Sequence, residues 1–267
     1  MKKVKYFSLI MLLALMLTGC GDKENSNNGI DNGDNKEVVY YSDVETIYFN
    51  AETGKKCDNY EESNSNTGNT KGCLKWYLYS DNGNKTVNLL LDHNITSTID
   101  WNTRENLING PSDELLTALK ENTKNWTGID DRKDKYTLNL GEINYTIDYK
   151  GYKARLISAE EIKEIVKDTS STEDGKIYFD KSTCSYDWDS TPKCQYGWLF
   201  DRTQGDCKNY GCYNDGGSSY WTSTAYSNDR YKTAYRVYLG YLAPTTIETD
   251  YSSIGIRPVI TISKDAL

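Results

Sequence analysis

The sequence contains one histidine and seven cysteines, and no two of the cysteines are separated by two residues. Structural zinc sites use clustered His and Cys ligands, so this composition argues against zinc. Basic residues are also fewer than acidic residues, 31 against 39, which gives a net charge of −8. Nucleic acids and anionic membrane surfaces attract clustered Lys and Arg, so neither is an expected partner.

Only the N-terminal end carries a long apolar run. Three lysines precede an apolar stretch over residues 7–17, and this segment is typical of a cleaved export signal rather than a membrane span. The order Leu17-Thr18-Gly19-Cys20 resembles a bacterial lipobox. That resemblance implies cleavage after residue 19 and lipid attachment at Cys20, which becomes the new N-terminus. The alternative is an ordinary secretory signal followed by an incidental cysteine.

The segment after Cys20 has almost no apolar residues to bury. Residues 21–37 read GDKENSNNGIDNGDNKE, a composition that predicts a flexible tether. Cleavage would remove three lysines and no acid, which takes the net charge from −8 to −11. We therefore expect the lipid alone to hold the protein at the outer leaflet of the membrane, facing the exterior, with a single domain over residues 38–267.

Six cysteines remain after Cys20, an even number that indicates three disulfides in an exported protein. Six cysteines allow fifteen pairings. We predict the pairs that are nearest in sequence, each closing a polar loop: Cys57 with Cys73, Cys184 with Cys194, and Cys207 with Cys212.

Two stretches have the alternation of hairpins. Asn82-Gly83 predicts a two-residue type I′ turn, so that Leu78 faces Val87, Trp76 faces Leu89 and Leu74 faces Leu91, all on one face. Gly141-Glu142 predicts a type II′ turn. The expected pairs there are Tyr136 with Ile147, Leu138 with Tyr145, and Leu140 with Ile143.

Two short helices are expected between strands. Leu115, Leu116 and Leu119 have helical spacing within residues 112–126. A second helix begins at Ser158 with capping-box spacing to Glu161 and should end near residue 168. Residues 169–219 read as a long loop region interrupted by residues 198–200, and further strands are expected over residues 38–50, 220–224, 234–239 and 256–262.

Several segments together carry a family resemblance. Residues 57–95, the stretch YKGYKARLISAEEI over residues 149–162, and the ending with YWTSTAY, AYRV and GIRPVITIS resemble uncharacterised surface or exported proteins of gut Firmicutes and their wall-less relatives. Those proteins are similar to bacterial C-type-lectin-like families, whose wider relatives include the sulfatase-modifying-factor (formylglycine-generating enzyme) domains. The resemblance implies an α+β, C-type-lectin-like fold of twisted antiparallel sheets, two helices and a long disulfide-stapled loop region. It implies no settled function.

The best functional signal is a set of aromatic side chains among Asn, Asp, Ser and Thr, a mixture that binding loops use because Tyr offers a large contact area at small entropic cost. We expect the loops over residues 184–213, 225–233 and 240–253 to share one face. Trp198, Trp221 and Tyr235 are expected to be structural instead. The predicted ligand-binding residues are Tyr186, Trp188, Tyr226, Asn228, Asp229, Arg230, Tyr231, Tyr241 and Tyr251.

The function expected from these features is non-catalytic binding of an extracellular glycan or protein by a surface-anchored lipoprotein. Calcium is a weaker hypothesis, with Asp187 and Asp189 as candidate ligands. Two alternatives stay open. One is a cysteine oxidoreductase of the sulfatase-modifying type, which would use Cys207 and Cys212, and the other is a passive envelope or assembly component.

Two further polar residues are expected to serve the fold. His93 follows the apolar residues 89–91 and is expected to form hydrogen bonds at a strand end rather than to act as a catalytic base, because the sequence supplies no nucleophile or orienting group for it. Arg257 precedes the last strand. We expect it to pair with a buried carboxylate or to cap loop carbonyls.

Overall fold

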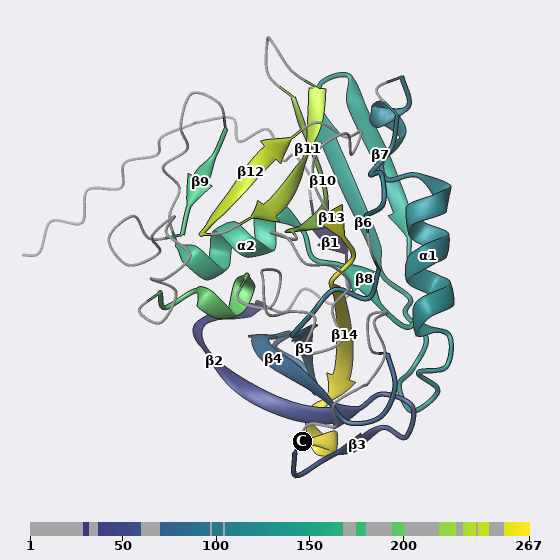
Figure 1. The fold of residues 1–267 in the computed structure, drawn as a ribbon, viewed down its shortest axis with the longest axis vertical. Coiled ribbons are helices and arrows are strands. Elements are labelled where there is room, and N and C mark those ends of the chain that lie inside the picture. The colour runs from purple at the N-terminus through teal and green to yellow at the C-terminus, as the bar shows by residue number, and fades with distance from the viewer. Residues whose placement is uncertain are drawn as a thin grey trace, which may run out of the picture.

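The computed structural model describes residues 29–31, 37–59, 70–96, 98–103, 105–167, 175–179, 194–200, 219–227, 232–238, 240–245 and 254–267. Within these residues the chain forms three mostly antiparallel sheets and two α-helices, an α+β fold (Figure 1). For residues 29–31 only the backbone is described.

The largest sheet has six strands, in the order β3 (Lys55–Lys56), β2 (Val39–Asn50), β4 (Leu74–Asp81), β5 (Thr86–Leu91), β14 (Pro258–Ser263) and β8 (Arg155–Leu156). The second sheet has five, in the order β13 (Ile254–Gly255), β10 (Ser219–Ser227), β11 (Lys232–Tyr238), β12 (Tyr241–Thr245) and β9 (Ile177–Tyr178). The third has three, in the order β1 (Gly29–Asp31), β6 (Lys135–Leu140) and β7 (Ile143–Asp148).

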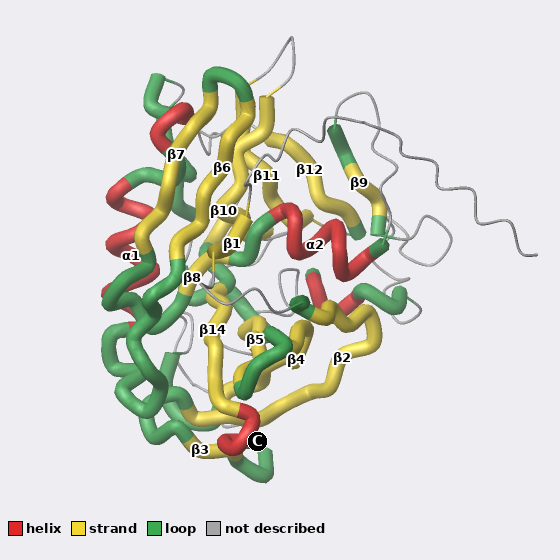
Figure 2. The backbone as a smooth tube through the Cα atoms, turned by 180° about the vertical axis from the view of Figure 1, so that it is seen from behind, coloured by secondary structure: helices red, strands yellow, loops and turns green. Residues whose placement is uncertain are grey.

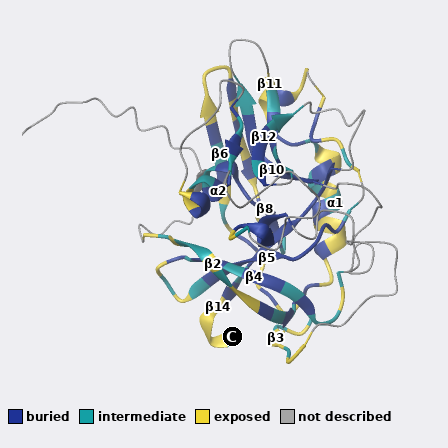
Figure 3. Cartoon of the chain, turned by 60° about the vertical axis from the view of Figure 1, so that its left-hand side comes forward, coloured by how far each residue is buried: buried dark blue, intermediate teal, exposed yellow. Residues whose placement is uncertain are grey.

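Two α-helices and three 3₁₀ turns complete the described elements. The helix α1 (Asp113–Thr123) lies beside β7, and α2 (Ala159–Val166) lies between the five-stranded and six-stranded sheets, as both ribbon views show (Figures 1 and 2). Each helix has a buried and an exposed side (Figure 3). The 3₁₀ turns span Leu107–Asn109, Gly197–Leu199 and Lys264–Ala266.

The predicted helices are confirmed by their caps. The Ser112 side chain accepts a hydrogen bond from the Leu115 amide at the start of α1. At α2 the full capping box is present, with the Ser158 hydroxyl bonded to the Glu161 amide and the Glu161 carboxylate bonded to the Ser158 amide. The helix ends where Lys167 adopts the left-handed conformation.

The hairpin of β6 and β7 has the predicted register: Tyr136 pairs with Ile147, and Leu138 with Tyr145. Gly141 has φ of +56°, as the first position of a type II′ turn requires. The two-residue turn therefore fixed the register as the sequence indicated.

The register predicted for the β4–β5 hairpin is wrong by two residues. Leu78 pairs with Leu89 rather than Val87, and Trp76 pairs with Leu91 rather than Leu89. The Asn82 amide donates to the Thr86 carbonyl, so the turn is longer than two residues, and the pairing is irregular beyond Leu78. An even shift keeps every side chain on its expected face, and that part of the prediction is confirmed.

The six-stranded sheet separates two hydrophobic cores. On one face Trp76, Leu89 and Ile260 pack with α1, β6 and β7. On the other face Tyr77, Leu90 and Val259 pack with α2, the 3₁₀ turn at 197–199 and the inner face of the five-stranded sheet. Alternation along each strand distributes the side chains between the two cores.

Three strands differ from the expected segment boundaries: β1, β10 and β12. Within the segment predicted to be a flexible tether, the backbone of Gly29–Asp31 pairs with β6. β10 continues to Ser227, and the expected loop at 240–253 begins with the strand β12. Cys20 and the signal segment lie outside the described residues, and no described helix is long and apolar enough to span a membrane.

Candidate ligand-binding site

Three tyrosines form a row across one face of the five-stranded sheet. Tyr238 of β11 pairs with Tyr241 of β12, which pairs in turn with Tyr178 of β9. All three are half-buried. We call Tyr178, Tyr238 and Tyr241, together with Lys176 and Arg236, the tyrosine ladder.

Alternation along β11 explains the position of the ladder. Tyr235 and Val237 point into the core beside α2, so Arg236 and Tyr238 lie on the opposite face. Toward β10 this opposite face is covered. Trp221, the cross-strand partner of Arg236 on β10, is buried in the core that contains Trp76 and α1. Toward β9 it becomes half-exposed. The ladder therefore begins where the core under the sheet ends.

The rings of the ladder contact one another at steep angles. The ring centroids of Tyr238 and Tyr241 are 5.6 Å apart with planes at 75°, and those of Tyr178 and Tyr241 are 5.9 Å apart at 59°. Tilted and edge-to-face pairs at this distance are favourable because the positive ring edge meets the negative ring face. The contacts hold the three rings in a defined arrangement.

A cation lies over each ring. The Lys176 amine is 4.8 Å from the centroid of Tyr241 and 6.0 Å from that of Tyr178. The guanidinium carbon of Arg236 is 4.7 Å from the centroid of Tyr238. All three distances lie within the range of cation–π attraction. The ladder combines aromatic area with positive charge on a chain that is acidic overall.

Burial shifts the pKa of two groups in the ladder, Tyr241 and Arg236. It raises the pKa of the Tyr241 phenol to about 12, partly offset by the nearby Arg236. Burial also lowers the pKa of the Arg236 guanidinium, against the influence of Tyr241 and Tyr238. Guanidinium groups stay charged at neutral pH. The ladder therefore presents the neutral phenol of Tyr241 beside the charged guanidinium of Arg236.

Tyr226, another predicted binding residue, does not join this site. Its ring packs against Tyr235 at 5.2 Å and against the core beside α2, on the opposite face of the sheet from Tyr241. A side chain on Gly175 would overlap with the Tyr226 ring. The structure thus separates Tyr226 from Tyr241, which the sequence placed in one set.

The remaining predicted site residues cannot be placed. The part of the chain that the structure describes does not include seven of the predicted ligand-binding residues: Tyr186, Trp188, Asn228, Asp229, Arg230, Tyr231 and Tyr251. It also does not include the calcium candidates Asp187 and Asp189 or the cysteines Cys184, Cys207 and Cys212. Those assignments stay predictions. Within the described residues no group of three or more His, Cys, Asp or Glu side chains is arranged to hold a metal ion.

The residues expected to be structural are buried. Trp221, Tyr235 and Trp198 pack in the two cores, and His93 is fully buried. Arg257, also fully buried, donates to the carbonyl oxygens of Leu91, Leu199 (2.6 Å) and Trp198 (2.7 Å). Arg257 therefore caps loop carbonyls, one of its two expected roles.

Sequence reasoning missed four members of the ladder. Arg236 and Tyr238 lie within the strand expected over residues 234–239, where they alternate with the buried Tyr235 and Val237. Tyr178 and Lys176 were assigned to an irregular loop region. The signal was a charged and aromatic pair alternating with apolar residues in the stretch AYRVY.

Two of the predicted disulfides include at least one cysteine in the described part of the chain. Cys57 is bonded to Cys73, as predicted. Cys194 is also disulfide-bonded, and its partner lies outside the described residues. Pairing of Cys194 with Cys184 stays a prediction.

No protein-family model, curated protein or solved structure matches this chain. The structure supports the coarser fold class, α+β with mostly antiparallel sheets, two helices and a disulfide.

Proposed function

We propose that the chain is a lipid-anchored surface protein with a C-type-lectin-like domain, and that it binds an extracellular protein without catalysis. The observation that carries the proposal is the tyrosine ladder, in which Lys176 and Arg236 lie over three half-buried rings. Tyr and Arg are enriched in the energetically important centres of protein interfaces. The lipid at Cys20 provides the membrane anchor.

The ladder favours a protein over a glycan as the ligand. A sugar ring stacks on an open aromatic face, whereas here a cation lies over a face of each ring and ring edges meet their neighbours. An acidic segment of a protein can pair with the cations and contact the phenols at once. Charge complementarity of this kind gives specificity and speeds association.

A binding screen with matched variants tests the proposal. The full chain is screened against extracellular proteins and glycans, and each hit is remeasured with Lys176→Gln and Tyr238→Ala. Lys120→Gln is the control, since Lys120 also lies over a tyrosine, Tyr152, at 5.2 Å, but outside the ladder. We expect a protein hit whose Kd rises about tenfold or more in both ladder variants, while Lys120→Gln leaves it unchanged.

Two outcomes would overturn this proposal. One is the absence of any reproducible protein hit, and the other is a protein hit that the ladder variants and Lys120→Gln affect equally. A glycan hit lost in the ladder variants would keep the site but replace the ligand class. Weakening of a protein hit by added salt would support the role of the two cations.

A further inference from the structure

The second face of the six-stranded sheet changes character along its length. Where α2 covers it, the cross-strand partners Leu90 and Val259 pack into the core. Two residues further along the same strands, the partners are Asn88 and Thr261. Thr261, which bonds to Asn88, lines an open groove of about 570 Å³, which we call the polar groove.

Three separate parts of the chain form the walls of the polar groove. They are the β4–β5 turn, residues 130–135 before and at the start of β6, and the end of β14, with Lys153 beside them. The second wall is held in place by its backbone, because the Arg132 amide donates to the Tyr152 carbonyl and the Gly151 amide donates to the Arg132 carbonyl. The volume is in the usual range for small-ligand sites.

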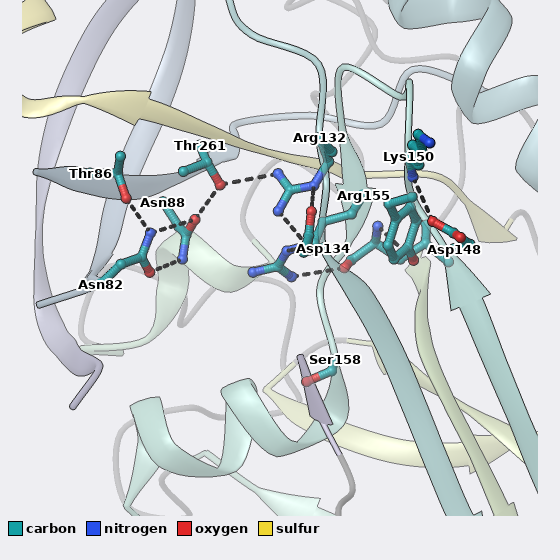
Figure 4. Close-up of polar contacts among 12 residues, drawn as sticks. Asn82, Thr86, Asn88, Arg132, Asp134, Asp148, Lys150, Arg155, Ser158 and Thr261 are labelled. Atoms are coloured by element: carbon teal, nitrogen blue, oxygen red, sulfur yellow. Dashed lines mark hydrogen bonds and ion pairs between the residues drawn. The ribbon is translucent and has the colours of Figure 1, made fainter. Parts of the chain in front are cut away.

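A network of side-chain hydrogen bonds forms the floor of the polar groove (Figure 4). The Arg132 guanidinium donates to the Thr261 hydroxyl (3.1 Å), which donates to the side-chain oxygen of Asn88 (2.6 Å). The side chains of Asn88 and Asn82 donate to each other (2.7 and 3.4 Å), and the Asn82 side-chain amide also donates to the Thr86 hydroxyl (2.9 Å). Each group therefore has a fixed orientation before any ligand arrives.

This hydrogen-bonded network is more polar than folding requires. Asn82, Asn88 and Arg132 are more than nine-tenths buried, at 7%, 4% and 8% exposure. Apolar side chains at buried positions usually stabilise a fold at least as well as a satisfied polar network does. A buried, preorganised polar floor below an open groove is what a binding site for a polar ligand needs.

Most charges of the polar groove lie in ion pairs, and the exposed Asp130 and Lys133 add one charge of each sign to its lining. The Arg132 guanidinium holds the Asp134 carboxylate through two bonds, at 2.8 and 2.7 Å. The Lys153 amine lies 2.8 Å from Asp131. Although burial alone would raise the pKa of Asp134, Arg132 holds it below its usual range, so the pair stays charged. A charged ligand on the floor of the groove would compete with these two pairs, whereas an uncharged ligand would not.

We propose that the polar groove binds an uncharged saccharide. A hydroxyl group is both a donor and an acceptor, so neighbouring hydroxyls of a sugar need adjacent donors and acceptors on the protein. The lining of the groove carries donors on Arg132 and Lys153 and acceptors on Asp131 and Asn82, with Lys153 beside Asp131. This assignment does not depend on the tyrosine ladder or its ligand.

Ligand-observed NMR on the full chain tests the proposal with defined probes. The neutral probes are maltose, cellobiose, lactose and N,N′-diacetylchitobiose, and the charged probes are glucuronic acid and glucosamine. Each is used at about 10 mM, which would saturate a site with a Kd of about 1 mM. We expect at least one neutral probe to bind and the charged probes to bind more weakly.

Two variants assign the binding to the groove. Asp131→Asn removes a charged acceptor from an exposed position and should raise the Kd about tenfold, the effect of losing one hydrogen bond to a charged group. Thr261→Val removes the hydroxyl that joins Arg132 to Asn88 and should weaken binding as well. Glu121→Gln is the matched control, because Glu121 is an exposed acid paired with Lys124 at 2.7 Å outside the groove.

The assignment is overturned by any of three results: no neutral probe binds, a charged probe binds more tightly than every neutral one, or Asp131→Asn leaves the Kd unchanged. Since Asp131 is exposed and outside the buried network, its variant remains informative even if Thr261→Val fails to fold. Lys176→Gln should leave saccharide binding unchanged, which keeps this result separate from that of the ladder.

Discussion

The guanidinium of Arg155 donates two hydrogen bonds of 2.6 Å to the two carboxylate oxygens of Glu161, and both side chains are buried. The same carboxylate accepts from the Tyr79 hydroxyl at 2.9 Å and from the Ser158 amide at 2.9 Å. Glu161 is therefore both the third residue of the α2 capping box and the partner of a buried cation on β8. The pair fixes the start of α2 against the six-stranded sheet.

This ion pair predicts a pH-dependent stability. Burial alone would raise the pKa of Glu161, but Arg155 and the hydrogen bonds outweigh burial and hold it below its usual range. A lowered folded-state pKa contributes stability above the unfolded-state pKa of about 4.3, and this contribution is lost as pH falls through the folded-state pKa. Glu161→Gln leaves the buried Arg155 with only the longer contact to Asp134, at 3.9 Å, and should cost about 3 kcal/mol at neutral pH.

Urea unfolding, followed by tryptophan fluorescence from neutral pH to below about pH 4, measures this contribution. The difference between wild type and Glu161→Gln should shrink as the pH falls. Glu121→Gln, at an exposed ion pair, should give a curve close to that of wild type. Parallel curves for wild type and Glu161→Gln would show that Glu161 contributes no pH dependence.

The Cys57–Cys73 disulfide predicts a stability change of its own. The two cysteines are 16 residues apart, and a loop of that length gains about 3 kcal/mol in the chain-entropy account. The double variant Cys57→Ser, Cys73→Ser should therefore unfold at lower urea concentration by about that free energy. A loss well under 1 kcal/mol would contradict the prediction, because the bond would then restrain little in the unfolded chain.

The remaining cysteines predict a thiol count. All six cysteines after Cys20 should be oxidised in the folded, unreduced protein, with Cys184 bonded to Cys194 and Cys207 bonded to Cys212. Alkylation followed by peptide mapping measures both the count and the pairing. Two reactive thiols at Cys207 and Cys212 would instead favour the oxidoreductase alternative.

Local sequence signals predicted the elements whose geometry is local. The α2 start follows from Ser158 and Glu161, three residues apart, and the β6–β7 register follows from a two-residue turn at Gly141. The β4–β5 register failed because a longer turn and an irregular pairing depend on side chains such as Asn82 and Asn88, which bond to each other across the hairpin. Such side-chain contacts cannot be predicted from the alternation of apolar and polar residues.

The sites depend on contacts between distant segments, so the sequence predicted them less well. The polar groove joins residues near 84, 132 and 261, and no one of these segments is unusual by itself. The strand β12 contains Pro244, which reads as a loop signal, yet β12 lies between β11 and β9 and carries Tyr241 of the ladder. Tyr241 was predicted from composition, whereas its partners needed the sheet order.

A close approach of two glycines gives the last prediction. Gly128 donates its amide to the Ala51 carbonyl at 2.9 Å and lies against Gly54, where a Cβ on either residue would overlap with the backbone of the other. Backbone cannot move aside as a flexible side chain can, so Gly128→Ala should cost about 3 kcal/mol, as severe overpacking does.

Gly151→Ala is the comparison: its φ of +79° is strained for alanine, but nothing lies within 4 Å of the new Cβ. That variant should cost only about 1–2 kcal/mol, and urea unfolding of the two side by side measures the difference. If Gly128→Ala proves no more destabilising than Gly151→Ala, the backbones of residues 54 and 128 do not pack as closely as the structure places them.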